Sequence, residues 1–187
     1  MIELYDRYSQ ESRDLHESLV ATGLSQLGVV IDADGFLPDG LVSPFTYYLG
    51  YEKGKPLYFN QVPVPAFWEI SGNNQSARIE DMTQERALIH YADGMQARLV
   101  KQVEWKDLEG RVRQVDHYNR FGACFATTTF SADSEPVMTV YQDVNGQEVL
   151  LENHVTGDIL LTLPGQSMRY FATKVEFITF FLQDLEI

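Results

Sequence analysis

The side chains that could form a metal site or a nucleophilic centre are few and widely spaced. The four histidines are His16, His90, His117 and His154, and no pair has the i, i+4 or H-x-H spacing of a metal site. Cys124 is the only cysteine, so the chain cannot form an internal disulfide. These patterns predict no metal ion.

Two of the histidines have carboxylates close by in the sequence. His117 directly follows Asp116, and His154 lies near Asn153 and Asp158. Such neighbours make both imidazoles candidates for acid–base catalysis in a stand-alone hydrolase or isomerase. The same residue types are also common in β-turns, which explain the pattern equally well.

The loops that bind phosphates or present a nucleophile do not occur in the sequence. None of the motifs G-x-G-x-x-G, G-x-x-x-x-G-K-[ST] and G-x-S-x-G is found. Asp32, Asp34 and Gly35 begin like a calcium loop, but the later ligands are missing and a plain turn is expected. We therefore predict no cofactor and no complete catalytic site.

Charge and cysteine usage restrict the partners and the compartment. The net charge is −13, from 27 acidic and 14 basic side chains, which argues against nucleic acid and anionic membranes as ligands. The longest strongly apolar stretches are too short to cross a bilayer, so no membrane insertion is expected. A single cysteine and a polar start over residues 1–14 predict a cytoplasmic protein.

Aromatic side chains between residues 45 and 68 could bind a sugar ring or a partner protein. Rings of this kind offer large apolar surfaces, and those of tyrosine and tryptophan add a polar group. They also fill hydrophobic cores, and the pattern does not separate the two uses. The candidate contact residues are Phe45, Tyr47, Tyr48, Tyr51 and Trp68.

Residues 1–34 have the pattern of a β-α-β unit with parallel strands. The apolar stretch Ile2–Tyr5 predicts the first strand, and Ser9 and Gly23 predict the start and the end of the helix. Residues 27–31 then predict a second, buried strand.

Residues 35–171 predict an extended antiparallel sheet. Prolines exclude a helix between residues 35 and 67. The pairs Asp93-Gly94 and Asn145-Gly146 predict two-residue hairpin turns further along. We expect about nine strands in meander order. One of them is predicted from the alternation of Met95, Ala97, Leu99, Val103 and Trp105.

Residues 172–187 change to a helical period. Thr173 and Glu176 form the pattern of a capping box. The predicted apolar face consists of Val175, Ile178, Phe181, Leu182 and Leu185. The pattern is unbroken at Ile187, so the natural chain is expected to continue. The fold class is therefore α+β and mainly antiparallel β, with a meander sheet between the β-α-β unit and an amphipathic helix.

Three stretches resemble sequences of the GtfB family, and the similarity extends from Met1 to the end of the chain. They are DGFLPDGLVSPFTYY at 34–48, PLYFNQVPVP at 56–65 with FWE at 67–69, and ENHVTGDILL at 152–161. None of these stretches is a mechanistic motif. The resemblance therefore transfers no individual functional residue.

The resemblance implies a non-catalytic, chaperone-like subunit of the GtfA–GtfB glycosyltransferase in the accessory Sec system. Such a subunit stabilises the GtfA-like catalytic partner and helps to bind the serine/threonine-rich acceptor, a serine-rich repeat adhesin. It implies that residues 1–34 begin a Rossmann-like half, that 35–171 are an added sheet domain, and that the protein works in the cytoplasm or at the cytoplasmic face of the membrane. The alternative is a stand-alone carbohydrate- or peptide-binding β module.

Overall fold

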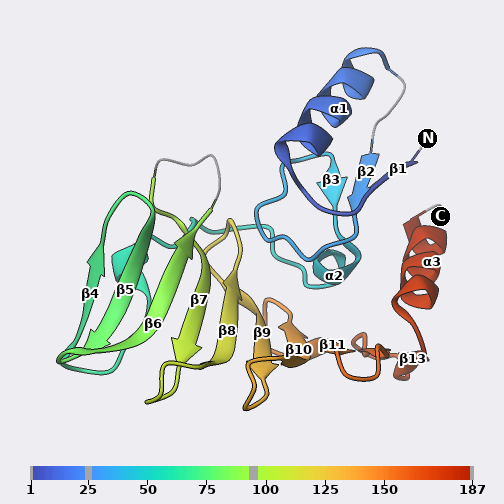
Figure 1. The fold of residues 1–187 in the computed structure, drawn as a ribbon. Coiled ribbons are helices and arrows are strands. Elements are labelled where there is room, and N and C mark those ends of the chain that lie inside the picture. Colours follow the sequence, from blue (N-terminus) through green and yellow to red (C-terminus); the bar gives the residue numbers. More distant parts are fainter. Residues whose placement is uncertain (1, 24–26, 93–96, 186–187) are drawn as a thin grey trace.

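A computed structural model describes residues 2–23, 27–92 and 97–185 of the chain. Figure 1 shows a long antiparallel sheet, with a small parallel unit lying above part of it and a helix at its C-terminal end. The predicted fold class is confirmed, with the meander flanked by the β-α-β unit and the C-terminal helix.

The parallel unit contains three strands and a helix. They are β1 (Ile2–Tyr5), α1 (Gln10–Ala21), β2 (Leu27–Val30) and β3 (Leu41–Val42). Strands β1 and β2 pair in parallel, and β3 adds to β2 in parallel as a third strand that the sequence did not predict. The Ser9 side chain caps α1 by accepting a hydrogen bond from the Ser12 N–H, and Gly23 follows the helix with φ +71°.

The antiparallel sheet of the described residues has ten strands in strictly sequential order. That is one more strand than the sequence predicted. Asn145 and Gly146 lie in the turn that joins β10 to β11, but this turn has three residues and not the predicted two. The Gly146 N–H donates to the Asp143 carbonyl oxygen, and the Asp143 N–H donates to the Gln147 carbonyl oxygen. The strands are β4 (Trp68–Gly72), β5 (Ser76–Asp81), β6 (Gln84–Tyr91), β7 (Val100–Lys106), β8 (Val112–Tyr118), β9 (Cys124–Phe130), β10 (Pro136–Gln142), β11 (Glu148–Asn153), β12 (Ile159–Leu161) and β13 (Arg169–Phe171).

The strand predicted from residue 95 begins only at Val100. Arg98 has φ +51°, which interrupts an extended strand, and the pairing of β6 with β7 shifts register between His90 and Tyr91. The shift buries Val100 where the alternation had predicted Leu99. The predicted Asp93-Gly94 turn and Met95 lie outside the described residues.

A short helix contradicts the prediction that prolines exclude helices between residues 35 and 67. Helix α2 (Pro44–Tyr47) begins with Pro44, and the Ser43 side chain accepts a hydrogen bond from the Phe45 N–H. Proline is tolerated at this first position because its missing N–H would have no partner within the helix. Another short helical segment, η1 (Phe59–Gln61), follows in the same region.

The C-terminal helix α3 (Lys174–Leu185) presents most of the predicted face to the core, with one exchange. Phe181 is buried as predicted, and Ile178, Leu182 and Leu185 are half-buried. Val175 is exposed, and its place in the core is taken by Phe177, which the pattern did not include. Thr173 accepts from the Glu176 N–H as predicted, but the Glu176 carboxylate accepts from the Ala172 N–H instead of from Thr173 itself. Only half of the predicted capping box therefore forms.

Two hydrophobic cores lie on opposite faces and at opposite ends of the long sheet. The first lies under α2 and α3 and includes Phe45, Tyr141 and Phe177. The second includes Ile89 and Val103, and segment 57–64 covers it. Strand pairing fixes the two faces, since adjacent side chains on a strand point to opposite sides. No helix within the described ranges is long and apolar enough to cross a membrane.

Candidate functional site

The predicted contact residues Phe45, Tyr47 and Tyr48 lie on or directly after helix α2, some in the core and some at the surface. The Phe45 ring is fully buried, 5.3 Å from the rings of Tyr141 and Phe177. Tyr47 is about half exposed and packs edge-on against Tyr48 and Phe181. Phe45 therefore anchors the helix, and Tyr47 is available at the surface.

Tyr48 and Tyr51 are held by hydrogen bonds to opposite parts of the fold. The Tyr48 hydroxyl donates to Asp184 of α3 at 3.3 Å. Burial and then the Asp184 carboxylate raise the pKa of Tyr48 well above its ordinary value. The Tyr51 hydroxyl donates to the carbonyl oxygen of Asp143 at 2.9 Å, and burial raises its pKa. Both tyrosines therefore remain neutral hydrogen-bond donors at physiological pH.

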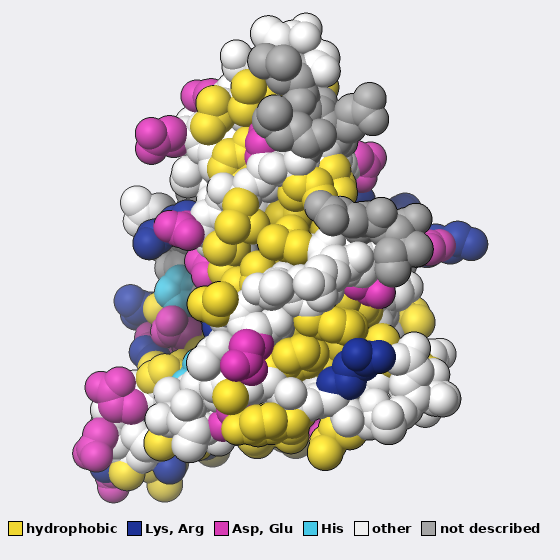
Figure 2. Space-filling view, turned by 90° about the vertical axis from the view of Figure 1, so that its right-hand side faces the viewer, with side chains coloured by type: hydrophobic (Ala, Val, Ile, Leu, Met, Phe, Trp, Pro, Cys, Tyr) yellow, Lys and Arg dark blue, Asp and Glu magenta, His cyan; other side chains and the backbone are white. Residues whose placement is uncertain are grey.

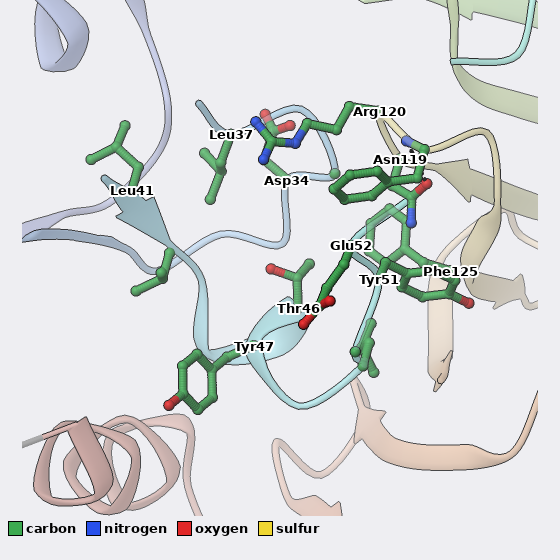
Figure 3. A pocket seen from close by; sticks show the side chains of 15 residues that line it. Asp34, Leu37, Leu41, Thr46, Tyr47, Tyr51, Glu52, Asn119, Arg120 and Phe125 are labelled. Carbon is green, nitrogen blue, oxygen red and sulfur yellow. Dashed lines mark hydrogen bonds between the residues drawn. The ribbon is translucent and has the colours of Figure 1, made fainter. Parts of the chain in front are cut away.

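A cavity of about 260 Å³ opens between the parallel unit, α2 and the β8–β9 turn. Figure 3 shows its lining side chains, which come from two stretches of the chain, residues 34–52 and 119–125. Tyr47 and Tyr51 are the two predicted contact residues that line it. The other labelled members are Asp34, Leu37, Leu41, Thr46, Glu52, Asn119, Arg120 and Phe125.

Two of the charged residues that line this cavity, Asp34 and Arg120, are held by ion pairs and a backbone contact. Lys101 donates to Asp34 at 3.0 Å, and Arg120 donates to Asp39 at 2.7 Å. The Arg120 N–H also donates to the Gly35 carbonyl oxygen at 2.8 Å. Carboxylates, a guanidinium and tyrosines in one hollow suit a polar ligand, but they do not form a nucleophile–base pair.

Trp68 is separated from the other predicted contact residues. It starts β4, at the opposite end of the long sheet from α3, and the Arg86 guanidinium lies 5.1 Å from its ring. Trp68 packs against the second core. It therefore does not belong to the surface formed around α2.

The structure brings together the two histidines that the sequence singled out, but by way of two threonines. The Gln102 amide nitrogen lies 3.2 Å from His117 Nδ1, and His117 Nε2 lies 2.8 Å from Thr128 Oγ1. Thr128 Oγ1 lies 2.8 Å from Thr139 Oγ1, which lies 2.7 Å from His154 Nε2. We call these five side chains the hydroxyl–imidazole chain.

A second cavity, of about 360 Å³, opens above this chain. Ala126 and Tyr141, which are paired between β9 and β10, both line it. Burial lowers the pKa of His117 to about 4, against an opposing effect of Asp116. His117 is therefore neutral at physiological pH, and both its ring nitrogens are already hydrogen-bonded.

The described residues contain no cluster of three or more His, Cys, Asp or Glu side chains arranged to hold a metal ion. Burial, followed by the Asp116 charge, raises the pKa of Cys124 to about 11, so its thiol is protonated and unreactive. Sequence reasoning missed Arg120, Asn119 and Glu52 as cavity residues. No local signal marks them, because their proximity to Tyr47 arises only in the fold.

Comparisons with known proteins agree on one family. The family model described as the GtfB N-terminal domain matches residues 2–48, and the GtfB middle domain model matches residues 68–172. The chain is 91% identical over 187 residues to a Streptococcus pneumoniae protein. It is 52% identical over 189 residues to one from Streptococcus gordonii. Both are named UDP-N-acetylglucosamine–peptide N-acetylglucosaminyltransferase stabilizing protein GtfB.

These relatives are longer than the chain. Each alignment includes the whole of this chain but only 42% of the relative. Among solved structures, one chain of a GtfA/B complex bound to UDP and GlcNAc matches with a TM-score of 0.95 at 52% identity. That match covers 100% of this chain and 42% of the other. The pneumococcal O-GlcNAc transferase GtfA matches with a TM-score of 0.66 at 13% identity, covering 100% of this chain and 41% of the other, which shows a shared fold.

Proposed function

The chain belongs to the GtfB family, and we propose that it acts in a non-catalytic subunit that stabilises a peptide N-acetylglucosaminyltransferase. The observation that carries this proposal is the 91% identity, over every residue of the chain, to a protein named as such a stabilising protein. Differences at this level leave the fold and most surfaces unchanged.

The proposed partner is a GtfA-like catalytic subunit. A structure of a GtfA/B complex contains a chain 52% identical to this one, which supports the pairing. The two hydrophobic cores leave one apolar part of the long sheet without a covering layer. That part is the natural place to look for the contact with the partner.

The uncovered part is a row of side chains across five strands, which we call the open row. Strand register places its members side by side on the face opposite the first core, from β9 to β13. None belongs to either core, and the last is 63% exposed. Apolar surface of this kind marks protein contacts. The open row consists of Thr127, Val140, Leu151, Leu160 and Tyr170.

A second apolar surface suits the rest of a longer protein. Figure 2 shows hydrophobic side chains gathered along the face that carries α1 and α3. Leu4, Leu15 and Val20 of the parallel unit are each about half exposed. We propose that residues 1–34 begin a Rossmann-like half that the remainder of such a protein completes. The division into 1–34, 35–171 and 172–187 stays a prediction.

The acceptor and the compartment are further parts of the proposal. A serine/threonine-rich polypeptide, as in a serine-rich repeat adhesin of the accessory Sec system, could pair with an unpaired strand edge through its backbone. Strand β4 is one such edge of the described sheet. We place this function in the cytoplasm or at the cytoplasmic face of the membrane.

A second candidate function is a stand-alone carbohydrate- or peptide-binding module. The cavity beside Tyr47 and Tyr51 favours it, because it combines aromatic rings with Asp34, Glu52 and Arg120. If this is the function, Tyr47→Ala and Glu52→Gln should each weaken binding of N-acetylglucosamine or of glycosylated peptide. Unmodified peptide would then not compete.

The stabilising function is tested on the catalytic subunit. We expect its thermal midpoint to rise when the full-length protein carrying this chain is added, because a ligand that binds only the folded state stabilises it. The rise should depend on the concentration of the added protein. An unchanged midpoint, with no complex on size-exclusion chromatography, would contradict the proposal.

A further inference from the structure

With the Gln102 amide nitrogen facing His117, the hydroxyl–imidazole chain has one consistent arrangement of its hydrogens. The Gln102 amide nitrogen can only donate, so His117 Nδ1 accepts and His117 Nε2 carries the ring hydrogen. His117 therefore donates to Thr128, whose own hydrogen must go to Thr139. Thr139 then donates to His154 Nε2. Every bond points from β7 toward His154.

Adding one proton to His154 is incompatible with this direction. A protonated imidazole carries hydrogens on both nitrogens and accepts none. Thr139 and His154 Nε2, 2.7 Å apart, would then both be donating toward each other. Thr128 and Thr139 are buried, and unpaired buried hydroxyls cost about 1–3 kcal/mol each. Breaking the hydrogen bonds of the hydroxyl–imidazole chain would therefore destabilise the folded state.

Reversing the whole chain removes the conflict. His154 donates to Thr139, Thr139 to Thr128, and Thr128 to His117 Nε2, which now accepts. His117 then carries its hydrogen on Nδ1, and the Gln102 amide turns its oxygen toward it. One proton is taken up in total, at His154. The hydroxyl hydrogens only rotate, and His117 loses a hydrogen at Nε2 and gains one at Nδ1 by exchange with solvent.

We propose that the hydroxyl–imidazole chain is a pH-sensitive switch, in which protonation of His154 at the cavity rim reverses the tautomer of His117 across the sheet. His117 lies on β8 and His154 follows β11, which are three strand spacings, or about 14 Å, apart. Protonation of His154 at the surface thus changes the tautomer of His117 in the region between the two cores.

Charged side chains from three elements surround the cavity above the hydroxyl–imidazole chain. Asp32 after β2, Glu152 of β11 and Lys174 of α3 line the same cavity as both rings. Glu152 pairs with Lys174 at 3.7 Å and accepts from the Tyr141 hydroxyl. Asp158 lies in the turn that follows His154.

Asp116 and Lys101 act on His117 itself. Because burial outweighs the Asp116 charge, the pKa of His117 is lowered to about 4, so the ring stays neutral above that pH. The buried ring can therefore respond by changing tautomer without gaining a proton.

The test is ¹⁵N NMR of the imidazole rings in the full-length protein, labelled with [¹⁵N]histidine. Single His→Gln variants assign the signals. As the pH falls, we expect His117 Nε2 to change from the protonated to the unprotonated shift and Nδ1 to change the opposite way. The midpoint should equal that of His154. A His117 ring that keeps its tautomer while His154 titrates, or that itself becomes doubly protonated, would overturn the proposal.

Three variants separate the switch from a merely structural role. Thr139→Val should leave His154 titrating but fix the His117 tautomer, whereas Thr139→Ser should restore the exchange. Thr129→Val, on the opposite face of β9, should leave the exchange intact. If Thr139→Val does not fold, His154→Gln at the exposed rim removes the titrating group and should give a pH-independent His117 tautomer. A His117 tautomer that still follows pH in His154→Gln would contradict the proposal.

Discussion

Gly54 lies so close to Phe121 that a Cβ on the glycine would be 2.1 Å from the Phe121 carbonyl oxygen. The reciprocal approach occurs at Gly122, where a Cβ would be 2.3 Å from the Lys55 carbonyl oxygen. Both glycines have positive φ, which side chains disfavour. This double contact fixes segment 54–57 across the β8–β9 turn, and thereby helps to set the wall of the first cavity.

Gly54→Ala should lower the free energy of unfolding by about 2–4 kcal/mol, because strain at φ +143° is combined with a backbone clash. Gly110→Ala is the matched control, since its φ is +79° but no atom lies within 4 Å. It should cost about 1–2 kcal/mol. Urea denaturation measures both variants. Equal losses would show that the close contact with Phe121 contributes nothing.

Thr128→Val should lower the free energy of unfolding by about 1–3 kcal/mol, because it leaves His117 and Thr139 without their buried partner. The double variant Thr128→Val, Thr139→Val should lose less free energy of unfolding than the two single variants together, since both substitutions remove the same hydrogen bond. Chemical denaturation of the two single variants and the double variant forms the cycle. Strict additivity would mean that the two hydroxyls are not coupled.

Stability should fall as the pH drops from about 6.5 to about 4. Burial lowers the pKa of His117 to about 4, so in this window the unfolded chain binds a proton that the folded chain does not. Stability is therefore present above the unfolded pKa and is lost toward the folded one, by at most about 3 kcal/mol. His117→Gln should flatten this slope in urea unfolding at pH 4.5 and 7. An unchanged slope would assign the effect to carboxylates.

Phe177→Ala should lower the free energy of unfolding by about 3–5 kcal/mol, because Phe177 is fully buried against Phe45 and Phe171. Val175→Ala should change it by less than about 0.5 kcal/mol, since Val175 is exposed. Thermal unfolding followed by circular dichroism compares the two. A larger loss for Val175→Ala than for Phe177→Ala would mean that Val175 packs in the core, as the sequence pattern predicted.

The meander could be predicted from the sequence because its turns are local. Gly146, with φ +76°, favours the turn between β10 and β11 through its backbone preference alone. Gly23, with φ +71°, favours the end of α1 in the same way. Features that depend on packing could not be predicted. A register shift in the β6–β7 pairing moved the buried position from Leu99 to Val100, and the core drew Phe177 inward in place of Val175.

The candidate site was predictable only in part for the same reason. Tyr47 and Tyr51 stood out by residue type, and both line the first cavity. Arg120 is 73 residues from Tyr47 in sequence (120 − 47) and no pattern connects them. The threonines that join His117 to His154 were equally invisible, because cross-strand neighbours are defined by register.

The most direct test of the proposed function is the affinity of the catalytic subunit for the full-length protein with an altered open row. In the double variant Val140→Thr, Leu151→Thr, strand propensity is retained while apolar contact is lost. We predict that isothermal titration shows binding at least about tenfold weaker, equivalent to roughly 1.4 kcal/mol. The control Leu108→Thr, Val155→Thr changes exposed turn residues off the row and should bind like the parent protein. Unchanged affinity of the open-row variant would contradict the assignment of this surface to the catalytic partner.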